Sequence, residues 1–512
     1  MKTILLFLIA TGFITSCAEE SLEYQRQGEN EGPGKMVLGE KLENPYSVKN
    51  MRAAYASLPA RTRAAVDDAP VEEVIYTTHH YVKFKPKTEE ELGILKSDST
   101  LMLYPYPLDY DIIAYGEYRD PGIPDEQPTY YYASVPVDQA LPDQVEWEIV
   151  EELYIPDEYS DEEEEAVTRS GKALDDAFIE DLVDKALEIT GNDDPRVAVT
   201  RSRSSWRPAG FITYFDDATN RTIGLEGVKV KARRWFTTHK GYACASTGYY
   251  YCDGTFKRDA NYSFDLERND FHVKGSGVKT DFDGPKKRGN WDYSFRRSKS
   301  ETEYFAATIF RAAYHYYYKE IGGLRRPPQN SFWRTQMKLK AFNENGRNNF
   351  KSARRFLGGN MIKIYTPSDG TVRLYATTIH ELAHAAHWRM IVKEPGTNRH
   401  RDYHDDSNDK NKEGWARGVQ YFLTRMVYPA YRGGDVLDEY TNVVVDLIDT
   451  EADAPGNNGK NATDGDNVTG YTMRQIEDAL IGVNTWNKWR DNIKNKYNNE
   501  TEHNLDALFA AW

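Results

Sequence analysis

The sequence predicts a multidomain α+β protein with a mixed N-terminal region, a central antiparallel β-sandwich and a mainly helical C-terminal domain that contains a small sheet. The chain has 512 residues, more than one hydrophobic core usually organises. Strand-like alternation is concentrated in the middle of the chain, whereas helical periodicity dominates its last part. Hydrophobic residues make up 39% and aromatic residues 13%, which indicates folded domains. The expected segments are a signal peptide at 1–17, a tether with a short helix at 18–71, a small mixed β-rich domain at 72–165, a helical linker at 166–205, the β-sandwich at 206–298 and the C-terminal domain at 299–512.

The N-terminus has the features of an export signal. Lys2 supplies a positive charge, and Ile4–Phe13 is an apolar run too short to span a bilayer. The four residues that end at Cys17 resemble the lipobox of bacterial lipoproteins, in which the cysteine is diacylated and becomes the mature N-terminus. The resemblance implies lipidation of Cys17 and an exported protein anchored to the bacterial cell envelope, at the outer membrane, where surface display is one arrangement. The alternative is an ordinary secretory signal with an incidental cysteine.

The charge of the chain excludes one class of partner. Its formal net charge is −15, and no broad basic excess exists to neutralise the phosphates of a nucleic acid. We therefore expect no nucleic-acid partner.

The chain has 3 cysteines, and lipidation of Cys17 would leave Cys244 and Cys252, which fall in one strand-rich stretch. Export makes a disulfide between them chemically allowed. Two small buried thiols are the equal alternative, because the sequence does not show whether the two Cα atoms approach closely enough for a bridge.

The region before the sandwich contains both types of element. A short helix is expected at Ser47–Ala65, and Val74–Phe84 alternates as a strand does. The acidic cluster Asp157–Glu165 is typical of a solvated linker, and Ala173–Ile189 has the pattern of an amphipathic helix.

The expected sandwich shows half-buried antiparallel strands. Val228–Arg233 alternates apolar with basic residues, and Tyr262–Leu266 alternates apolar with polar residues, so one face of each strand should be polar and point outward. Turn signals recur at Asp216–Asp217, Gly248 and Asp253–Gly254, at the spacing expected of a sandwich.

Three short stretches of this region resemble a known module. Gly224–Lys231, Thr247–Tyr250 and Tyr262–Phe264 are similar to the carboxypeptidase-regulatory-like or transthyretin-like β-sandwich, over about residues 206–280. The resemblance implies the fold and an accessory role beside a catalytic unit, and it implies no ligand.

After residue 299 the pattern becomes mainly helical. Alanine and aromatic residues form one helix that ends at Gly322–Gly323, and two strand candidates follow it. The elements expected here are a helix at Tyr304–Ile321, strands at Thr335–Phe342 and Asn360–Tyr365, a helix at Leu374–Val392, a helix from Glu413, and one or two helices within Tyr471–Tyr497.

The most informative feature is the sequence H-E-x-x-H that begins at His380 and ends at His384. Residues at i and i+4 lie one turn apart on the same helix face, so both imidazoles can reach one zinc ion at about 2.0–2.1 Å. Glu381 lies between them in sequence, where a carboxylate can deprotonate a coordinated water. Only 11 of the 512 residues are histidines, so a chance occurrence is rare. The alternative is a helix with two surface histidines. The residues around the two histidines are largely apolar, so this helix is expected to be buried, and burying histidines without a partner would be costly.

A catalytic zinc site needs a third protein ligand and one open position. His387 lies on the same rigid helix as the first two histidines and would point away from the tetrahedral position. The Asp402–Asp409 segment contains His404 but has the composition of a solvated loop. Glu413 is the preferred candidate, because it opens a further helix and the small Gly414 lets that helix approach the first one closely.

The H-E-x-x-H segment followed by Glu413–Ala416 resembles the gluzincin group of zinc metallopeptidases, over roughly residues 300–512. The spacing exceeds the shortest gluzincin spacings, and the polar segment Lys393–Asn411 can absorb the difference. The resemblance implies Glu381 as the general base and one zinc ion held by His380, His384 and Glu413.

A gluzincin-like site further implies a donor that stabilises the transition state and an edge strand that pairs with the substrate. Tyr471 is preferred over Tyr440 as the donor, and Asn360–Tyr365 occupies the place of the edge strand; a packing role and an ordinary strand are the alternatives. Arg417 stands where some gluzincins carry an acidic residue, so that part of the pattern is absent.

These observations predict zinc-dependent hydrolysis of peptide bonds in a protein or glycoprotein substrate by an exported, lipid-anchored metallopeptidase. Two alternatives stay open: a binding or adhesion lipoprotein whose zincin-like domain does not turn over, and a purely structural metal site. The presence of all four residues, His380, Glu381, His384 and Glu413, argues against the first alternative. Glu381 argues against the second, because a structural site needs no base.

Overall fold

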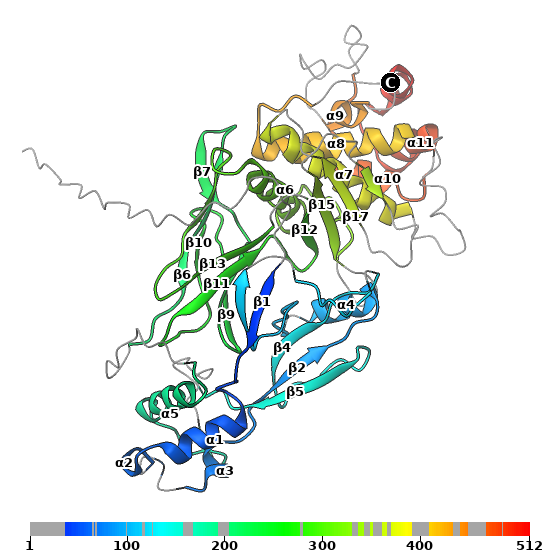
Figure 1. Ribbon diagram of the computed structural model, residues 1–512. Helices are drawn as coiled ribbons and strands as arrows, with labels where there is room; N and C mark the ends of the chain where they lie inside the picture. Colours follow the sequence, from blue (N-terminus) through cyan, green and yellow to red (C-terminus); the bar gives the residue numbers. More distant parts are fainter. Residues whose placement is uncertain are drawn as a thin grey trace, which may run out of the picture. The chain divides into compact units, whose positions relative to one another are not determined.

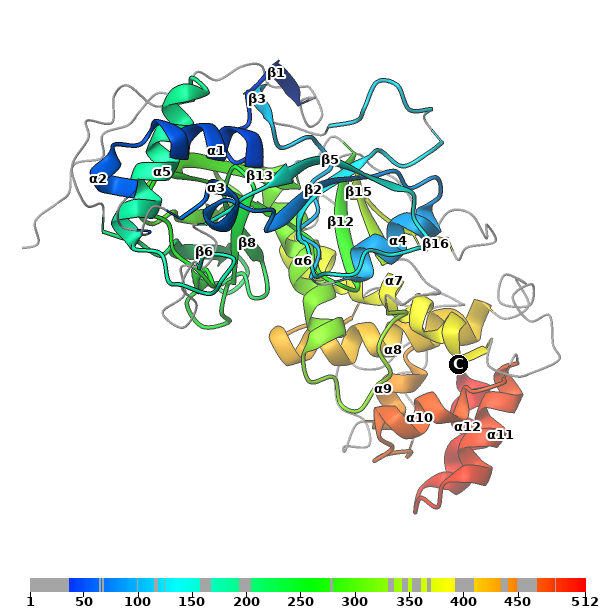
Figure 2. The same ribbon diagram turned by 90° about the horizontal axis from the view of Figure 1, so that it is seen from below.

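The computed structural model shows a mixed α and β protein with several antiparallel sheets and a helical C-terminal region (Figures 1 and 2). The chain from Gly32 to Trp512 forms one compact unit. The predicted signal peptide with Cys17, the segment with His404, and Tyr440 lie outside the described residues. The structure describes residues 36–63, 66, 69–98, 100–114, 118–124, 126–156, 167–192, 204–276, 280–329, 336–342, 349–351, 361–365, 370–391, 409–433, 441–448, 467–483 and 485–512.

The N-terminal region contains a three-stranded antiparallel sheet, in the order β4-β2-β5, and a two-stranded ribbon of β1 and β3. The helix expected after Ser47 is α1, which begins where the Ser47 side chain accepts a hydrogen bond from the amide of Asn50. The elements are β1 (Val37–Lys41), α1 (Val48–Ser57), α2 (Ala60–Arg63), α3 (Val71–Val74), β2 (His79–Phe84), α4 (Glu89–Ser97), β3 (Tyr110–Ala114), β4 (Tyr131–Pro136), β5 (Trp147–Leu153) and α5 (Asp176–Ile189).

The middle of the chain forms two four-stranded sheets, which share one hydrophobic core. The first has the order β10-β6-β14 with β7 also paired to β6, and the second has the order β13-β11-β8-β9. Val230 and Phe264 are register partners and fully buried, so the predicted alternation is confirmed there. The strands are β6 (Ala209–Asp216), β7 (Arg221–Gly224), β8 (Lys229–Arg234), β9 (Thr237–Tyr242), β10 (Tyr249–Tyr251), β11 (Ala260–Asp265), β13 (Asp281–Lys287) and β14 (Tyr293–Phe295).

The basic face of β8 is not an open surface. Lys231 and Arg233 expose only 9% and 8% of their area. Lys231 donates to Asp265 at 2.8 Å, and both cationic groups lie over the ring of Tyr104 from the N-terminal region, at 5.3 and 5.2 Å from its centroid. The expectation of an outward polar face was therefore wrong for β8, because aromatic residues of another segment cover it.

Cys244 and Cys252 are both free thiols, so the disulfide alternative is wrong for this structure. Cys244 is exposed, and its sulfur lies 3.2 Å from the hydroxyl of Thr247, whereas Cys252 is fully buried in the core. The alternative of two buried thiols therefore holds for Cys252 and is wrong for Cys244.

The strands of the C-terminal region belong to a third four-stranded sheet. Its order is β12 (Phe271–Ser276), β15 (Met337–Phe342), β17 (Met361–Tyr365) and β16 (Asn349–Lys351). The first three strands are parallel, and β16 is antiparallel to β17. β17 is paired on both sides, so the prediction that Asn360–Tyr365 forms the edge strand was wrong; β16 takes that place.

β12 also changes the expected domain boundary. It falls inside the 206–298 segment assigned to the sandwich, yet it pairs with β15 of the following segment over its whole length. One continuous hydrophobic core includes sandwich and helical residues together, among them Tyr214, Phe264, Phe310, Leu382 and Trp489. Residue 298 therefore separates neither two sheets nor two cores.

The C-terminal helices begin and end close to the expected positions. α6 starts three residues earlier than expected because the Ser300 side chain caps it by accepting from the amide of Glu303. α7 packs along both α6 and α8. The elements are α6 (Glu301–Tyr318), α7 (Thr371–Ile391), α8 (Asp409–Val427), α9 (Val443–Ile448), α10 (Met473–Ala479), α11 (Trp486–Lys496), η4 (Glu502–Asn504) and α12 (Leu505–Ala511).

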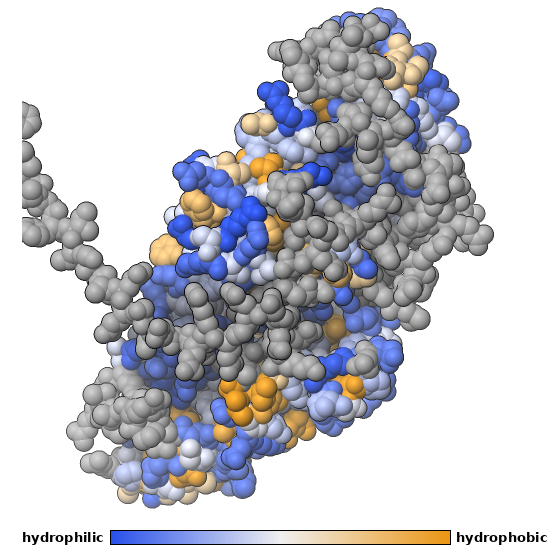
Figure 3. Space-filling view, turned by 45° about the horizontal axis from the view of Figure 1, so that its top comes forward, coloured by the Kyte–Doolittle hydropathy of each residue, from blue (hydrophilic) through white to orange (hydrophobic). Residues whose placement is uncertain are grey.

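On the face drawn in Figure 3, most of the described surface is hydrophilic, with small separate hydrophobic patches. Scattered exposed apolar side chains are normal on folded proteins. Among the described helices, none combines the length and the hydropathy that crossing a bilayer requires.

Two glycines let α8 lie close to the segment that contains α9. A Cβ at Gly414 would lie 2.7 Å from the hydroxyl oxygen of Thr441, and a Cβ at Gly418 would lie 2.3 Å from the Cβ of Val444. The expectation that Gly414 faces the helix of the two histidines was therefore wrong, because its open side is directed at residues 441–443.

We expect Gly418→Ala to destabilise the protein. The valine Cβ is fixed to its backbone, so α9 must shift, which costs about 1–3 kcal/mol and exceeds the roughly 1 kcal/mol that alanine gains in helix propensity. Denaturant unfolding monitored by circular dichroism measures the difference. Gln420→Ala, at a half-buried position of the same helix, is the control and should change stability by less than about 0.5 kcal/mol. A stabilised Gly418→Ala variant would contradict the close packing.

Candidate metal centre

Three side chains from two helices bring their ligand atoms together. His380 Nε2 lies 3.1 Å from His384 Nε2 and 3.1 Å from Glu413 Oε2, and His384 Nε2 lies 3.4 Å from the same oxygen. Within the described ranges, this is the one group of three or more His, Cys, Asp and Glu side chains whose ligand atoms could hold a metal ion.

These distances fit a shared metal ion. Ligands bound tetrahedrally at about 2.0–2.1 Å from one zinc ion lie roughly 3.3 Å from each other. The three observed separations, 3.1, 3.1 and 3.4 Å, fall around this value. Two imidazoles and one carboxylate also form a donor set that catalytic zinc sites use. The cluster could therefore hold one metal ion.

The helix α7 positions the two histidines through its period. The rings of His380 and His384 are one turn apart, with centroids at 4.7 Å and planes at 86°. Ile379, Leu382 and Ala383 have no exposed surface, so they fix this helix in the core. The orientation of the two imidazoles thus follows from the burial of their neighbours.

The helix α8 supplies Glu413 from its second turn. The helix begins at Asp409, earlier than the expected start at Glu413. Trp415, Ala416 and Val419 are fully buried and fix α8 against the core, which leaves Glu413 on the side of α7.

The cluster is partly shielded from water. The side chains of His380 and His384 each expose 11%, and that of Glu413 exposes 20%. Burial opposes ionisation of Glu413, but the charge of His384 and the hydrogen bonds from both histidines outweigh it and hold the pKa of this carboxyl well below its usual range. The carboxylate is therefore in the form that binds a cation.

Comparisons with protein-family models, with curated proteins and with solved structures find no match to this chain. Any functional conclusion therefore depends on the residues and geometry of the cluster itself.

Glu381, the expected general base, follows His380 on α7 and exposes 6% of its surface. The structure thus holds its carboxylate largely out of bulk water.

His387 is not part of the cluster. It exposes 1% of its surface, and burial, followed by the charges of His384 and Lys412, lowers its pKa to about 3. It is a neutral buried imidazole on α7, in agreement with the expectation that it is not the third ligand.

Tyr471 gains no support as a donor. Its amide donates to the carbonyl of Leu447, and its buried hydroxyl makes no hydrogen bond within the part of the chain that the structure describes. Burial, followed by the charge of Glu502, raises the pKa of Tyr471 to about 12. Its backbone is therefore bonded to α9, and no described contact joins its hydroxyl to the cluster.

Arg417, one turn beyond Glu413, donates to the side-chain oxygen of Asn442 at 2.8 Å. The residue that departs from the gluzincin pattern thus connects α8 to the segment before α9.

Sequence reasoning missed a second polar cluster, around the turn at Asp216–Asp217. The sequence identifies this pair only as a turn, yet its carboxylates bind residues of α6 and α7 and Tyr428, just beyond α8. No sequence signal distinguishes such a pair from ordinary turn residues.

Proposed function

We propose that the protein is a zinc metallopeptidase in which His380, His384 and Glu413 hold one zinc ion and Glu381 is the general base. The observation that carries this proposal is the convergence of three ligand atoms from two helices at 3.1 to 3.4 Å. It is combined with a buried glutamate directly after the first ligand.

The chemistry is hydrolysis of an amide. A zinc ion held by His380, His384 and Glu413 would lower the pKa of its water to about 7 and would polarise the substrate carbonyl. Glu381 accepts one proton from the water as its oxygen attacks the carbonyl carbon. The same carboxyl then donates that proton to the amine nitrogen as the C–N bond breaks, so the base returns to its ionised form.

The identity of the ion is inferred from the ligands. Two imidazole nitrogens and one carboxylate oxygen suit zinc, whereas magnesium and calcium prefer sites built from oxygen alone. The remaining exposure of the three side chains supports access for water and for a substrate carbonyl.

The cellular setting is part of the same proposal and is supported by the sequence alone. The lipobox-like end at Cys17 supports export and a lipid anchor in the bacterial cell envelope, with the outer membrane as the proposed location. The substrate class is proteins or glycoproteins of that compartment.

Metal removal tests the function. We expect the purified protein to contain one zinc per chain and to cleave members of a mixed protein and glycoprotein panel. Cleavage should stop after treatment with a chelator and return with stoichiometric Zn²⁺. Elemental analysis and mass spectrometry of the products provide the readouts.

The same measurements separate the alternatives. Zinc without cleavage, together with unfolding on chelation, would point to a structural site. Retained zinc without cleavage or unfolding would point to a binding or adhesion protein. Cleavage that persists at full strength without metal would remove the proposed mechanism.

A further inference from the structure

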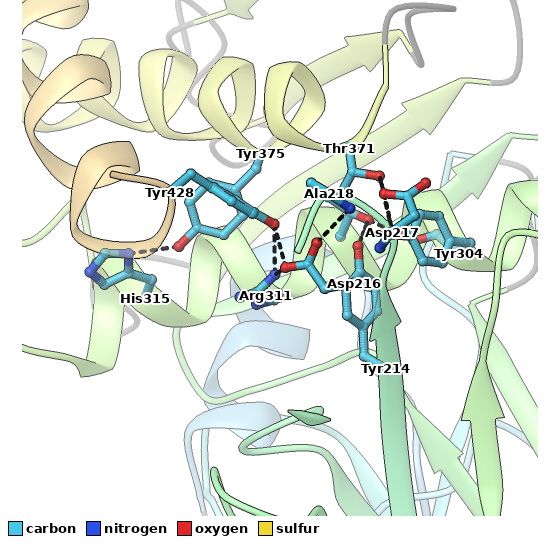
Figure 4. A network of polar contacts seen from close by, with 11 residues as sticks. Tyr214, Asp216, Asp217, Ala218, Tyr304, Arg311, His315, Thr371, Tyr375 and Tyr428 are labelled. Carbon is cyan, nitrogen blue, oxygen red and sulfur yellow. Dashed lines mark hydrogen bonds and ion pairs between the residues drawn. The ribbon is translucent and has the colours of Figure 1, made fainter. Parts of the chain in front are cut away.

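A buried polar network joins the sandwich to the helices of the metal centre (Figure 4). Asp216, the last residue of β6, exposes 1% of its surface. Its Oδ2 accepts from Nη1 of Arg311 on α6 at 2.7 Å and from the hydroxyl of Tyr428, directly after α8, at 2.9 Å. Arg311 Nη1 also donates to the Tyr428 hydroxyl at 2.7 Å. One carboxylate therefore binds α6 and the end of α8 together.

The guanidinium of Arg311 is enclosed by aromatic rings. Its carbon lies 5.4 Å from the centroid of Tyr428, 5.5 Å from that of Tyr214 and 5.6 Å from that of Tyr375 on α7. Tyr375 and Tyr428 also contact each other edge to face, with centroids at 5.4 Å. Aromatic residues of β6, α7 and the segment directly after α8 thus all contact the one guanidinium that α6 supplies.

The helix α7 is held at its first turns by further bonds. The Tyr375 hydroxyl and His315 Nδ1 of α6 share a hydrogen bond of 2.7 Å. Thr371, the first residue of α7, donates to Asp217, whose Oδ1 also accepts from the Tyr304 hydroxyl at 3.0 Å. The first turns of α7 are therefore tied to the same β6 turn as the residue after α8.

Such a network favours one arrangement of the helices. If Tyr428 moved away, Asp216 Oδ2 would keep only the donor from Arg311, and Arg311 would lose the Tyr428 hydroxyl as an acceptor. Buried polar groups are costly when they are left partly satisfied, so a displaced α8 is disfavoured.

The position of α8 on α7 decides the metal geometry, because Glu413 lies on α8 and both imidazoles lie on α7. We propose that Asp216, Arg311 and Tyr428 are positioning residues of the metal centre. They fix α8 at the end opposite to Glu413, so that its carboxylate meets the imidazoles at bonding distance. This inference rests on the proposed metal site and assigns it a dependence on the sandwich.

The test uses the full chain and measures the dissociation constants of Zn²⁺ and Co²⁺ together with the visible absorption spectrum of bound Co²⁺. Tyr428→Phe keeps the ring and removes the hydroxyl that bonds Asp216 and Arg311. We expect it to weaken Zn²⁺ binding, by less than the roughly 10–100-fold that follows loss of a group bonded directly to a metal ligand, and to change the Co²⁺ spectrum. Tyr375→Phe, which removes the bond to His315, repeats the test from the side of α7 and should act in the same direction.

The matched control is Tyr262→Phe. Tyr262 is a buried tyrosine of β11 whose hydroxyl donates to the carbonyl of Gly289 at 2.7 Å, so the change removes a hydrogen bond that involves no residue of the network. It should retain the wild-type metal affinity and Co²⁺ spectrum even if its unfolding temperature falls.

Wild-type affinity and spectrum in folded Tyr428→Phe and Tyr375→Phe would overturn the positioning role and leave the metal site intact. A wild-type chain that binds neither ion, or that binds them equally well after His380→Ala, would instead remove the proposed function. The two failures are therefore distinguishable.

Discussion

Replacement of Glu413 by alanine should weaken Zn²⁺ binding by at least about 100-fold. Loss of a group that merely orients a ligand costs roughly 10–100-fold in metal affinity, and Glu413 would be a direct ligand. Its oxygen lies 3.1 and 3.4 Å from the two imidazole nitrogens, and without it only two ligands remain. Competition with a coloured zinc chelator gives the dissociation constant.

The control for this variant is Glu301→Ala. Glu301 is an exposed residue at the start of α6, paired with Arg297 on the surface, and such pairs contribute little. It should bind zinc as the wild type does. If Glu413→Ala kept wild-type affinity, the carboxylate would not be a ligand, and α8 would contribute no ligand to the site.

Conversion of Glu381 to glutamine should abolish cleavage while zinc stays bound. The amide keeps the size of the carboxylate but cannot accept the proton of the attacking water, and a general base contributes roughly 10²–10⁴-fold. The three ligands are untouched, so the zinc content should remain one per chain. Rates on the panel of protein substrates and elemental analysis of the same sample provide the two readouts.

Glu303→Gln makes the matched change at a half-buried glutamate. Its carboxylate accepts from the Tyr293 hydroxyl at 2.7 Å, and an amide oxygen can take over that role. This variant should cleave at the wild-type rate. Equal activity in Glu381→Gln and wild type would remove Glu381 from the mechanism, whereas loss of zinc in Glu381→Gln would show that the residue supports the site structurally.

The cluster could be predicted because most of it is local. The spacing of His380 and His384 places both on one helix face whatever the rest of the fold, and burial of α7 was visible in its apolar residues. Glu413 was preferred because it opens a further helix beside small residues, and the resemblance to gluzincins implies the same ligand; the structure brings it to the histidines. Its role as a ligand and the identity of the ion stay predictions.

Long-range pairings could not be predicted in the same way. Phe271–Ser276 has a strand pattern, but nothing in it shows that its partner is β15 instead of a sandwich strand. The open side of Gly414 was assigned to the wrong helix, because a small residue indicates close approach without naming the neighbour. Whether the two cysteines pair could not be predicted for a similar reason, because their separation depends on the three-dimensional course of β9 and β10.

The position of β12 has a consequence for how this chain can be divided. β12 lies at one end of the third sheet, next to β15, and its residues are followed by β13 and β14, which return to the sandwich. A fragment that starts at residue 299 would leave the backbone donors and acceptors of β15 bare along one side, and it would also lack Asp216. An uncovered strand of this kind invites intermolecular association. Proteolysis or gene truncation in this region should therefore yield insoluble material, and the shortest soluble fragment that contains the candidate metal centre should begin before Ala209.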